Sequence, residues 1–379
     1  MYLTEEHTLI RTTVRDFAQS EIKPLAKELD EKEEFSIELT KKMGKIGLMG
    51  MTVSEEYGGQ GADYLSYIIA VEELARVDGS QAATVAAHNS LGVGPIYYFG
   101  NEEQKKKYLP KLCTGTALWA FGLTESEAGS DSQATKTTAE LKDSNWVVNG
   151  SKIFITNGSS EITAGATVKA VTGKKGDKKE YSTIIVESGT PGFRAKTMHG
   201  KMMWRASNTS ELYFDNCAVP EKNLLGSRGD GAKIMLNTLD SGRLAIGAMG
   251  LGLAQGAFEA ALKYSKERKQ FGQMISRFQV IAFKLADMAT KIEAARNLLY
   301  KACWLRDNTL PFGKEAAMAK LYCSEVAKEV ADEAVQIHGG YGLMKDFDVE
   351  RFYRDQRLLQ IGEGTSEIQR LVIARHIGC

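Results

Sequence analysis

One stretch near the middle of the chain decides the fold: Trp146-Val147-Val148-Asn149-Gly150-Ser151-Lys152-Ile153-Phe154-Ile155-Thr156. Apolar and aromatic residues lie on both sides of Asn149-Gly150, a dipeptide typical of two-residue hairpin turns. The stretch therefore predicts two strands joined at an Asn-Gly turn. Short strands are also predicted over 181–186 and 211–214, and the Lys/Gly-rich segment 173–179 predicts a solvated loop or hairpin tip.

Helical periodicity dominates on either side of this β region. Upstream, Ile10, Val14 and Phe17 share one helical face. Downstream, apolar residues recur at spacings of four and three over 281–299, which predicts a long packed helix. The order helices, strands, helices excludes a wound βαβ sheet and favours a helical protein with a small all-β insert. Gly250-Leu251-Gly252 lies inside a helical pattern, so it is a poor match to a dinucleotide-phosphate loop.

The composition is that of a globular protein that can bury substantial cores: 379 residues, 43% hydrophobic and 25% charged. Lys plus Arg equals Asp plus Glu at 48 each, which gives no overall field to attract nucleic acid or an anionic membrane. The five cysteines are far apart and form no Cys-x-x-Cys pair, which fits a reducing cytosol. The chain begins with a charged amphipathic pattern and contains no run of about 18 apolar residues. We therefore expect a cytoplasmic protein without nucleic-acid partners or membrane insertion.

The histidines give little support to metal or triad chemistry. All five are scattered, and the sequence has neither His-Glu-x-x-His nor a Gly-x-Ser-x-Gly elbow, so we expect no metal site. His338, beside Gly339-Gly340, is more typical of a packed core residue than of a ligand.

Glycine-punctuated polar segments are better candidates for chemistry. In Gln360-Ile361-Gly362-Glu363-Gly364-Thr365-Ser366, one carboxylate stands between two glycines just before a predicted helix, where the backbone can approach a ligand closely. The structural alternative is that Gly364-Thr365 forms a turn and N-cap, with Glu363 as a surface charge that complements the helix dipole.

Three further segments share this character: 121–131, 268–272 and 336–342. Each has an ordinary alternative. Thr124 to Glu127 has the spacing of a capping box, and residues 129–131 have the composition of a turn. Arg268 would be a charge at a helix end, and Gly339-Gly340 would end a helix.

Taken together, these four segments, in this order and spacing, resemble the acyl-CoA dehydrogenase family, FAD-dependent enzymes that desaturate acyl-CoA thioesters. Similar stretches include Glu55-Glu56-Tyr57-Gly58-Gly59, Trp204-Arg205-Ala206-Ser207-Asn208-Thr209 and Arg351-Phe352-Tyr353-Arg354-Asp355. The resemblance covers essentially the whole chain. It implies a mainly α fold with a β insert: an N-terminal helical domain (1–118), a middle β-barrel-like domain (119–227) and a C-terminal four-helix bundle (228–379). It also implies a homotetramer with FAD near the subunit interface.

The resemblance further implies which residues bind FAD. Thr124 would donate hydrogen bonds to the isoalloxazine, and Phe154 would stack beside it where many relatives carry Trp or Tyr. Arg268 would face the pyrophosphate of a neighbouring subunit's cofactor. The expected set is Phe121, Leu123, Thr124, Gly129, Ser130, Phe154, Thr156, Arg268, Gln270, Phe271, Gln279, Gln336, Gly339, Gly340, Thr365 and Glu367.

Glu363 matches the catalytic base of the short- and medium-chain branch of that family. There a carboxylate removes the α-proton of the thioester while the β-hydrogen leaves as hydride to flavin N5. In other branches the base stands on another helix, at the position that corresponds here to Gly242, which cannot take a proton. The expected substrate contacts are Ser130, Asp240, Arg243 and Gly364; for Asp240 and Arg243, a structural ion pair is the alternative.

One departure concerns acyl specificity: many straight-chain relatives have Tyr before the base, and this chain has Gly362. The resemblance therefore implies dehydrogenation of a short-chain, branched or cyclic acyl-CoA to the 2-enoyl-CoA, in fatty acid metabolism, with electrons passed to an electron-transfer flavoprotein. A flavin-dependent acyl-CoA oxidase or nitroalkane-type oxidase is the same-fold alternative. A non-catalytic helical oligomer would have lost Glu363, Thr124, Arg268 and Gln336, and all four are present.

Overall fold

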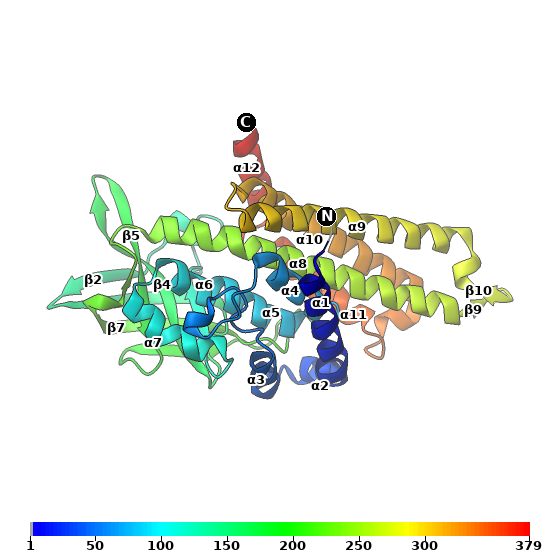
Figure 1. The fold of residues 1–379 in the computed structure, drawn as a ribbon, viewed down its shortest axis with the longest axis horizontal. Helices are drawn as coiled ribbons and strands as arrows, with labels where there is room; N and C mark the ends of the chain where they lie inside the picture. The colour runs from blue at the N-terminus through cyan, green and yellow to red at the C-terminus, as the bar shows by residue number, and fades with distance from the viewer. Residues whose placement is uncertain (1–2) are drawn as a thin grey trace.

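The computed structural model describes residues 3–379, and Met1 and Tyr2, the start of the predicted N-terminal domain, lie outside the described residues. Helices come first in the chain, a sheet follows, and long helices come last (Figure 1). This confirms the mainly α fold with a β insert. The division of the chain at 118 and 227 stays a prediction.

The first part of the chain is helical: α1 (Glu5–Phe17), α2 (Lys23–Lys32), α3 (Ile37–Lys45), α4 (Tyr64–Ala75), α5 (Gly79–Ala87), α6 (Gly94–Phe99) and α7 (Glu102–Cys113). Capping side chains explain where several begin: Thr4, Ser36, Asp63, Asp78 and Asn101 each accept a hydrogen bond from the first turn of the helix that follows. Every residue of α4 is buried, so this helix forms the centre of the N-terminal core.

The sheet contains β1 (Leu118–Gly122), β2 (Thr138–Lys142), β3 (Asn145–Thr156), β4 (Thr163–Lys175), β5 (Lys178–Glu187), β6 (Phe193–Thr197), β7 (Thr209–Pro220) and β8 (Leu224–Leu225). Its order is β6-β7-β3-β2-β4-β5-β8, with β1 paired to β4. The strands predicted over 181–186 and 211–214 lie in β5 and β7 and are confirmed. The hairpin tip predicted in 173–179 is confirmed at Gly176-Asp177, between β4 and β5.

The predicted turn at Asn149-Gly150 is wrong. Strand β3 runs through both residues and pairs with β7 along its length, with a register shift between Val148 and Gly150. Gly150 has a φ of 137°, and a Cβ there would lie 2.8 Å from the Cα of Thr137. The glycine therefore allows a β-bulge and a close approach of another segment. Both need the backbone conformation that glycine also supplies in a hairpin turn, which is why the sequence resembles one.

The last part of the chain is a helical bundle built from α8 (Gly231–Glu267), α9 (Gln279–Asp307) and α10 (Gly313–His338), followed by α11 (Val349–Asp355) and α12 (Ser366–Ile377). A short hairpin, β9 (Lys269–Gln270) and β10 (Gln273–Met274), joins α8 to α9. The helix predicted over 281–299 lies in α9 and is confirmed. The glycines 250 and 252 lie inside α8, so the rejection of a dinucleotide loop is also confirmed.

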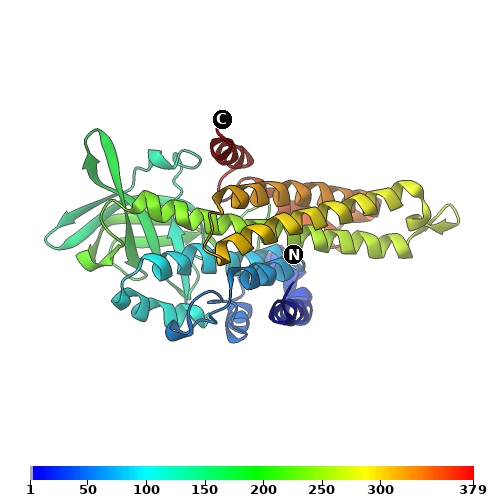
Figure 2. The ribbon, with the colours of Figure 1, turned by 45° about the horizontal axis from the view of Figure 1, so that its top comes forward.

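Helix α8 links the two ends of the molecule: it starts beside the sheet and runs the length of the bundle (Figures 1 and 2). It is long and apolar enough to cross a membrane by length and composition, but most of its apolar window is buried inside the protein. At Gly252 a Cβ would lie 2.2 Å from the carbonyl oxygen of Glu72. Helix α4 thus rests directly on the backbone of α8, which makes α8 the central core helix.

Candidate active site

The segment around Glu363 is a tight turn between the 3₁₀ helix Gln356–Gln360 and α12. Glu363 has a φ of 53° and Gly364 a φ of 95°. A left-handed conformation is strained for a residue with a side chain, and such strain often marks functional sites. Thr365 caps α12 by accepting a hydrogen bond from the N–H of Ile368 at 3.3 Å. The predicted turn and N-cap are therefore confirmed.

The Glu363 carboxylate, in contrast, is not a surface charge. Its Oε2 is buried and has no hydrogen-bond partner in the part of the chain that the structure describes. Burial raises the pKa of Glu363 to about 7, although the positive charges of Lys320 and Arg243 favour the ionised form. A buried carboxylate that titrates near neutrality and has a free oxygen is suited to act as a general base.

Glu363 faces the backbone of α8 at Gly242. A Cβ added at Gly242 would lie 1.7 Å from Oε2 of Glu363. The structure thus brings together the two positions that the resemblance connects with a base, Glu363 and Gly242. Because Gly242 has no side chain, the Glu363 carboxylate occupies the space that one would fill.

Lys320 belongs to this site and is not among the residues that the sequence pattern identifies. It lies on α10, is fully buried, and its Nζ donates to the carbonyl oxygen of Gly364 at 2.7 Å. Burial lowers the pKa of Lys320 to about 8, and the negative charge of Glu363 opposes this shift. The one signal in the sequence is the position of this lysine next to the small residues Ala316, Ala317 and Ala319. From the sequence alone, such a lysine is interpreted as a solvated charge.

Asp240 and Arg243, one turn of α8 around Gly242, form an ion pair with each other. The ion pair that was the alternative to a substrate-binding role for these two residues is therefore observed. Arg243 is buried, and its Nε has no hydrogen-bond partner among residues 3–379. Burial raises the pKa of Asp240, against the attraction of Arg243. Contact of this pair with a substrate stays a prediction.

The first set of predicted cofactor residues lies in the β region. Phe121 is buried near the end of β1, and Leu123 and Thr124 follow this strand. The carbonyl oxygen of Thr124 accepts from the N–H of Ile153 at 2.9 Å, which holds this segment beside Phe154 on β3. Phe154 is 63% exposed and has a φ of 61°. We call the seven residues of this region the near set: Phe121, Leu123, Thr124, Gly129, Ser130, Phe154 and Thr156.

The capping-box interpretation of Thr124 to Glu127 is wrong, because Glu125 forms an isolated β-bridge with Ala128 and no helix begins here. Buried Glu125 instead accepts hydrogen bonds from the N–H of Lys136 at 2.7 Å and from Nζ of Lys152 at 2.7 Å. Lys152 also donates to the carbonyl oxygen of Leu123 at 3.1 Å. This buried pair fixes the turn that follows β1, and with it the position of Thr124.

A second set, which we call the far set, lies at the opposite end of the bundle, at the β9–β10 hairpin (Figure 1). The guanidinium of Arg268 lies over the ring of Tyr341 at 5.6 Å, and Tyr264 stacks on His338 at 4.3 Å, so the end of α10 belongs to the same region. Phe271, at the hairpin tip, is 93% exposed. The far set is Arg268, Gln270, Phe271, Gln279, Gln336, Gly339 and Gly340.

His338 is buried and hydrogen-bonded to the carbonyl oxygen of Ala334 at 2.8 Å, which confirms the core interpretation. Helix α10 ends at His338, so the helix stop at Gly339-Gly340 is confirmed too. Thr365 and Glu367, the remaining predicted cofactor residues, lie at the start of α12 beside Glu363. The predicted cofactor residues thus form separate groups in one chain rather than a single cluster.

These groups fit FAD chemically. Phe154 offers an exposed aromatic face for a flat ring system, Thr124 offers a hydroxyl group on the segment that is hydrogen-bonded to Ile153, and Ser130 offers an exposed hydroxyl group. Arg268 makes no ion pair within the described residues, which leaves its guanidinium free for phosphates. A Cβ at Gly339 or Gly340 would meet nothing within 4 Å, so the backbone there is open to a ligand.

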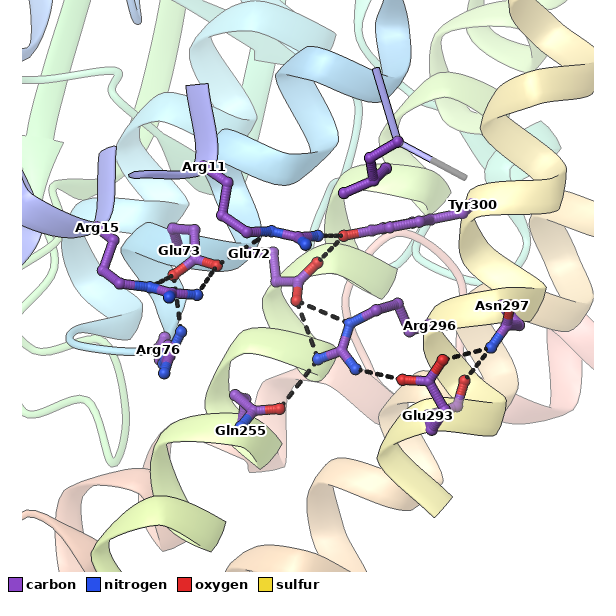
Figure 3. A pocket seen from close by; sticks show the side chains of 11 residues that line it. Arg11, Arg15, Glu72, Glu73, Arg76, Gln255, Glu293, Arg296, Asn297 and Tyr300 are labelled. Atoms are coloured by element: carbon purple, nitrogen blue, oxygen red, sulfur yellow. Dashed lines mark hydrogen bonds and ion pairs between the residues drawn. The ribbon is translucent and has the colours of Figure 1, made fainter. Parts of the chain in front are cut away.

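A separate polar pocket of about 360 Å³ lies between α1, α4, α8 and α9 (Figure 3). Its arginines already bind carboxylates: Arg15 and Arg76 bind Glu73, and Arg296 binds Glu72. The hydroxyl of Tyr300 donates to Glu72 at 2.5 Å. These groups satisfy one another, which indicates a structural network that joins α1 and α9 to α4 rather than a ligand site.

The N-terminal domain of acyl-CoA dehydrogenase matches residues 4–116, its middle domain matches 120–217 and its C-terminal domain matches 229–378. An acyl-CoA dehydrogenase of Bacillus subtilis is 49% identical over 380 residues, covering 100% of this chain and 99% of the relative. A short-chain specific acyl-CoA dehydrogenase of Clostridium acetobutylicum is 48% identical over 375 residues, covering 99% and 98%.

Solved structures show the same likeness. Butyryl-CoA dehydrogenase from Megasphaera elsdenii is 43% identical with a TM-score of 0.96, covering 100% of this chain and 99% of its own. A chain in the structure of an electron transferring flavoprotein of Acidaminococcus fermentans is 47% identical with a TM-score of 0.97, covering 100% and 99%. An acyl-CoA dehydrogenase from Bacillus anthracis, complexed with FAD, is 39% identical with a TM-score of 0.93, covering 99% and 66%.

Proposed function

The chain belongs to the acyl-CoA dehydrogenase family of FAD-dependent oxidoreductases, and we propose that Glu363 is its catalytic base. The proposed reaction converts a short-chain, branched or cyclic acyl-CoA to the 2-enoyl-CoA. The observation that carries this proposal is the buried Oε2 of Glu363, which has no partner among the described residues and faces the bare backbone of Gly242.

The chemistry required of Glu363 follows from the weak acidity of the thioester α-carbon. The carboxylate takes the α-proton on Oε2 as the C–H bond breaks, and it becomes a neutral carboxylic acid. Burial makes that product easier to form, because a neutral group is favoured where water is excluded. Lys320 and Arg243 act in the opposite sense and keep a fraction of Glu363 ionised before substrate binds. FAD, when bound, supplies the acceptor for the β-hydrogen.

The surroundings of Glu363 support a short or compact acyl group. Tyr64 and Tyr67 of α4 are buried, pack edge to face at 5.1 Å, and both lie close enough for the charge of Glu363 to raise their pKa further. These two buried rings on the α4 side of Glu363 support a compact acyl group. A Cβ at Gly362 would contact Leu358 at 3.4 Å. The absence of a side chain at Gly362, where many straight-chain relatives carry Tyr, supports a branched or cyclic acyl group. The short-chain and butyryl-CoA relatives support the same size class.

We further propose an assembly in which the far set of one subunit completes the FAD site formed by the near set of another, as in a homotetramer. The support is that the far set is exposed, that the near set exposes Phe154, Gly129 and Ser130, and that the two sets lie at opposite ends of the molecule (Figure 1). Helix α12 also projects from the body and exposes Leu371 and Ile377 (Figure 2). An electron-transfer flavoprotein as electron acceptor is supported by the likeness to a chain in such a structure.

A cytoplasmic location is supported by the cysteines: Cys113, Cys217, Cys303 and Cys323 are free and buried, and Cys379 is free and exposed, as in a reducing compartment.

The test of the reaction is an acyl panel under nitrogen. Purified enzyme with FAD is mixed with acyl-CoA esters from butyryl to palmitoyl, together with isobutyryl and cyclohexanecarbonyl esters, and the visible absorbance of the flavin is followed. We expect fastest bleaching with butyryl or the branched and cyclic esters. Absence of bleaching with every ester would refute the reaction, and fastest bleaching with palmitoyl would refute the size class. Repeating the assay in air separates the oxidase alternative, which produces hydrogen peroxide rapidly without an acceptor protein.

A further inference from the structure

We propose that Lys320 is a positioning residue for Glu363: its buried ammonium group holds the Glu363-Gly364 turn and places an uncompensated positive charge beside the carboxylate. This inference rests on the proposed role of Glu363 as the base, and it adds a residue outside the expected substrate and cofactor sets.

The ammonium group of Lys320 has a single strong contact. Its side chain is fully buried, and Nζ donates to the carbonyl oxygen of Gly364 at 2.7 Å. Within residues 3–379 no carboxylate lies at ion-pair distance from it. A buried lysine is expensive to hold in a protein unless it is paired. Its presence here therefore calls for a partner or a role at the turn that it contacts.

The turn itself needs support. Glu363 adopts a left-handed backbone with a φ of 53°, a conformation that persists only where the surroundings fix it. Gln369 of α12 donates to the carbonyl oxygens of Glu363 at 3.3 Å and Gly364 at 2.9 Å. Lys320 binds the Gly364 carbonyl from the opposite helix, α10. The turn is thus held from both sides, and Lys320 is the charged member of the pair.

The same face of α10 holds the chain before and after the turn. Ser324 donates to the carbonyl oxygen of Leu359 at 3.0 Å. Glu325 accepts from Gln360 at 2.8 Å and from Ser366 at 3.1 Å. Residues 320, 324 and 325 therefore form a continuous platform for the segment 359–366, and Lys320 is the part of this platform next to Glu363.

The charges around Glu363 come from three elements. Lys320 of α10 and Arg243 of α8 are the cations that act on it, and Tyr64 and Tyr67 of α4 are neutral near pH 7. Arg243 is paired with Asp240, which weakens its field at Glu363. Lys320 has no such partner, although Glu325 and Glu367 act on it from a greater distance than hydrogen bonding. Lys320 is therefore the main charge that favours ionised Glu363.

The test compares Lys320→Met with Lys320→Arg, and with Lys328→Met, an exposed lysine on the same helix, as matched control. The ionisation of Glu363 is followed by the infrared C=O band of its carboxylic acid, assigned by its loss in Glu363→Gln. This readout does not depend on turnover. The pH profile of anaerobic flavin reduction is measured in parallel.

We expect the midpoint of the Glu363 band to move up by about one pH unit in Lys320→Met. The reduction rate at pH 7 should then be roughly fivefold lower, because a rise in the pKa from about 7 to about 8 lowers the ionised fraction from about a half to about a tenth. Lys320→Arg should restore most of both, and Lys328→Met should match the wild type. An unchanged midpoint in Lys320→Met overturns the proposal, whatever happens to the rate.

If Lys320→Met does not fold, Lys320→Gln replaces it: the amide can still donate to Gly364, so the turn is kept and the charge is lost, and the same upward shift is expected. Failure of the proposed base is a separate result. In that case Glu363→Gln reduces its flavin at the wild-type rate, while the infrared titration still reports on Lys320.

Discussion

The Glu363 side chain combines a strained backbone, a buried oxygen without a partner among residues 3–379 and a neighbour that has no side chain. The glycines around it are visible in the sequence, and they indicate close backbone approach. Lys320 is not predictable in the same way, because only the fold decides that a lysine on α10 meets the carbonyl of Gly364. The local pattern thus marks Glu363 as a candidate, the family resemblance suggests its role as the base, and long-range packing shows which residues hold the turn around it.

Burial of Glu363 predicts a specific dependence of stability on pH. Its pKa is raised from 4.5 to about 7 in the folded protein, so between these values the folded state holds a proton that the unfolded state has lost. The free energy of unfolding therefore falls as pH rises through this window. Glu363→Gln removes this loss and should be more stable than the wild type at pH 8, by about 1 to 3 kcal/mol.

The measurement is urea unfolding from pH 5 to 8. Asp355, whose pKa burial also raises to about 7, contributes the same trend to both proteins and cancels in their difference. A difference between the two proteins that does not vary with pH would contradict burial of the Glu363 charge.

Gly242 supplies a second prediction about a single residue. Gly242→Ala puts a methyl group 1.7 Å from the present position of Oε2, so the carboxylate must move away. A displaced base costs about a hundredfold in the rate of flavin reduction, while FAD should stay bound. Gly247→Ala is the matched control on α8, since its Cβ would lie 3.1 Å from the end of the Leu299 side chain and at an ordinary contact distance of 3.8 Å from the backbone of Ala319. Equal rates for the two variants would contradict the contact between Gly242 and Glu363.

At the level of elements, the sequence predicts which segments form helices and strands better than it predicts the turns and helix starts between them. The long helix at 281–299 and the strands at 181–186 and 211–214 follow from periodicity, which is a local property. The Asn149-Gly150 turn and the capping box at Thr124 are wrong because non-local partners decide both places. Strand β7 pairs with β3 through the expected turn, and Lys152 and Glu125 fix the segment that resembles a helix start.

The network in Figure 3 gives a prediction about how elements are joined. Glu73 on α4 is buried and binds Arg15 of α1 at 2.8 Å and Arg76 at 3.1 Å. Glu73→Gln removes the charge that these arginines share and should lower the free energy of unfolding by about 3 kcal/mol. Glu293→Gln, on the same network but 64% exposed, should cost less than about 1 kcal/mol. Urea unfolding at neutral pH measures both, and similar losses would contradict a buried structural network.

At the scale of the whole molecule, the order of helices, strands and helices is predictable because it needs only a change of period along the chain. The separation of the near set from the far set is not predictable from periodicity, since it depends on the length of α8 and on where α10 ends. The resemblance supplies the expectation that Arg268 serves a neighbour, and the geometry supports it.

Complementation tests this arrangement. Glu363→Gln lacks the proposed base but keeps the far set, and Arg268→Ala lacks the proposed phosphate contact but keeps Glu363. If sites form between subunits, co-expressed mixtures contain some sites with both groups intact. At limiting FAD we expect the mixture to be more active than the sum of the two variants measured alone. Activity equal to that sum would contradict a shared site.

The role of Glu363 is decided by one rate: single-turnover reduction of bound FAD by butyryl-CoA, or by the most reactive ester of the panel, under nitrogen at pH 8. Glu363→Gln keeps the shape of the side chain and loses its basicity. We predict that the variant stays yellow, still binds the ester and reduces its flavin at least about a thousandfold more slowly than the wild type. Reduction at the wild-type rate would show that another group removes the α-proton.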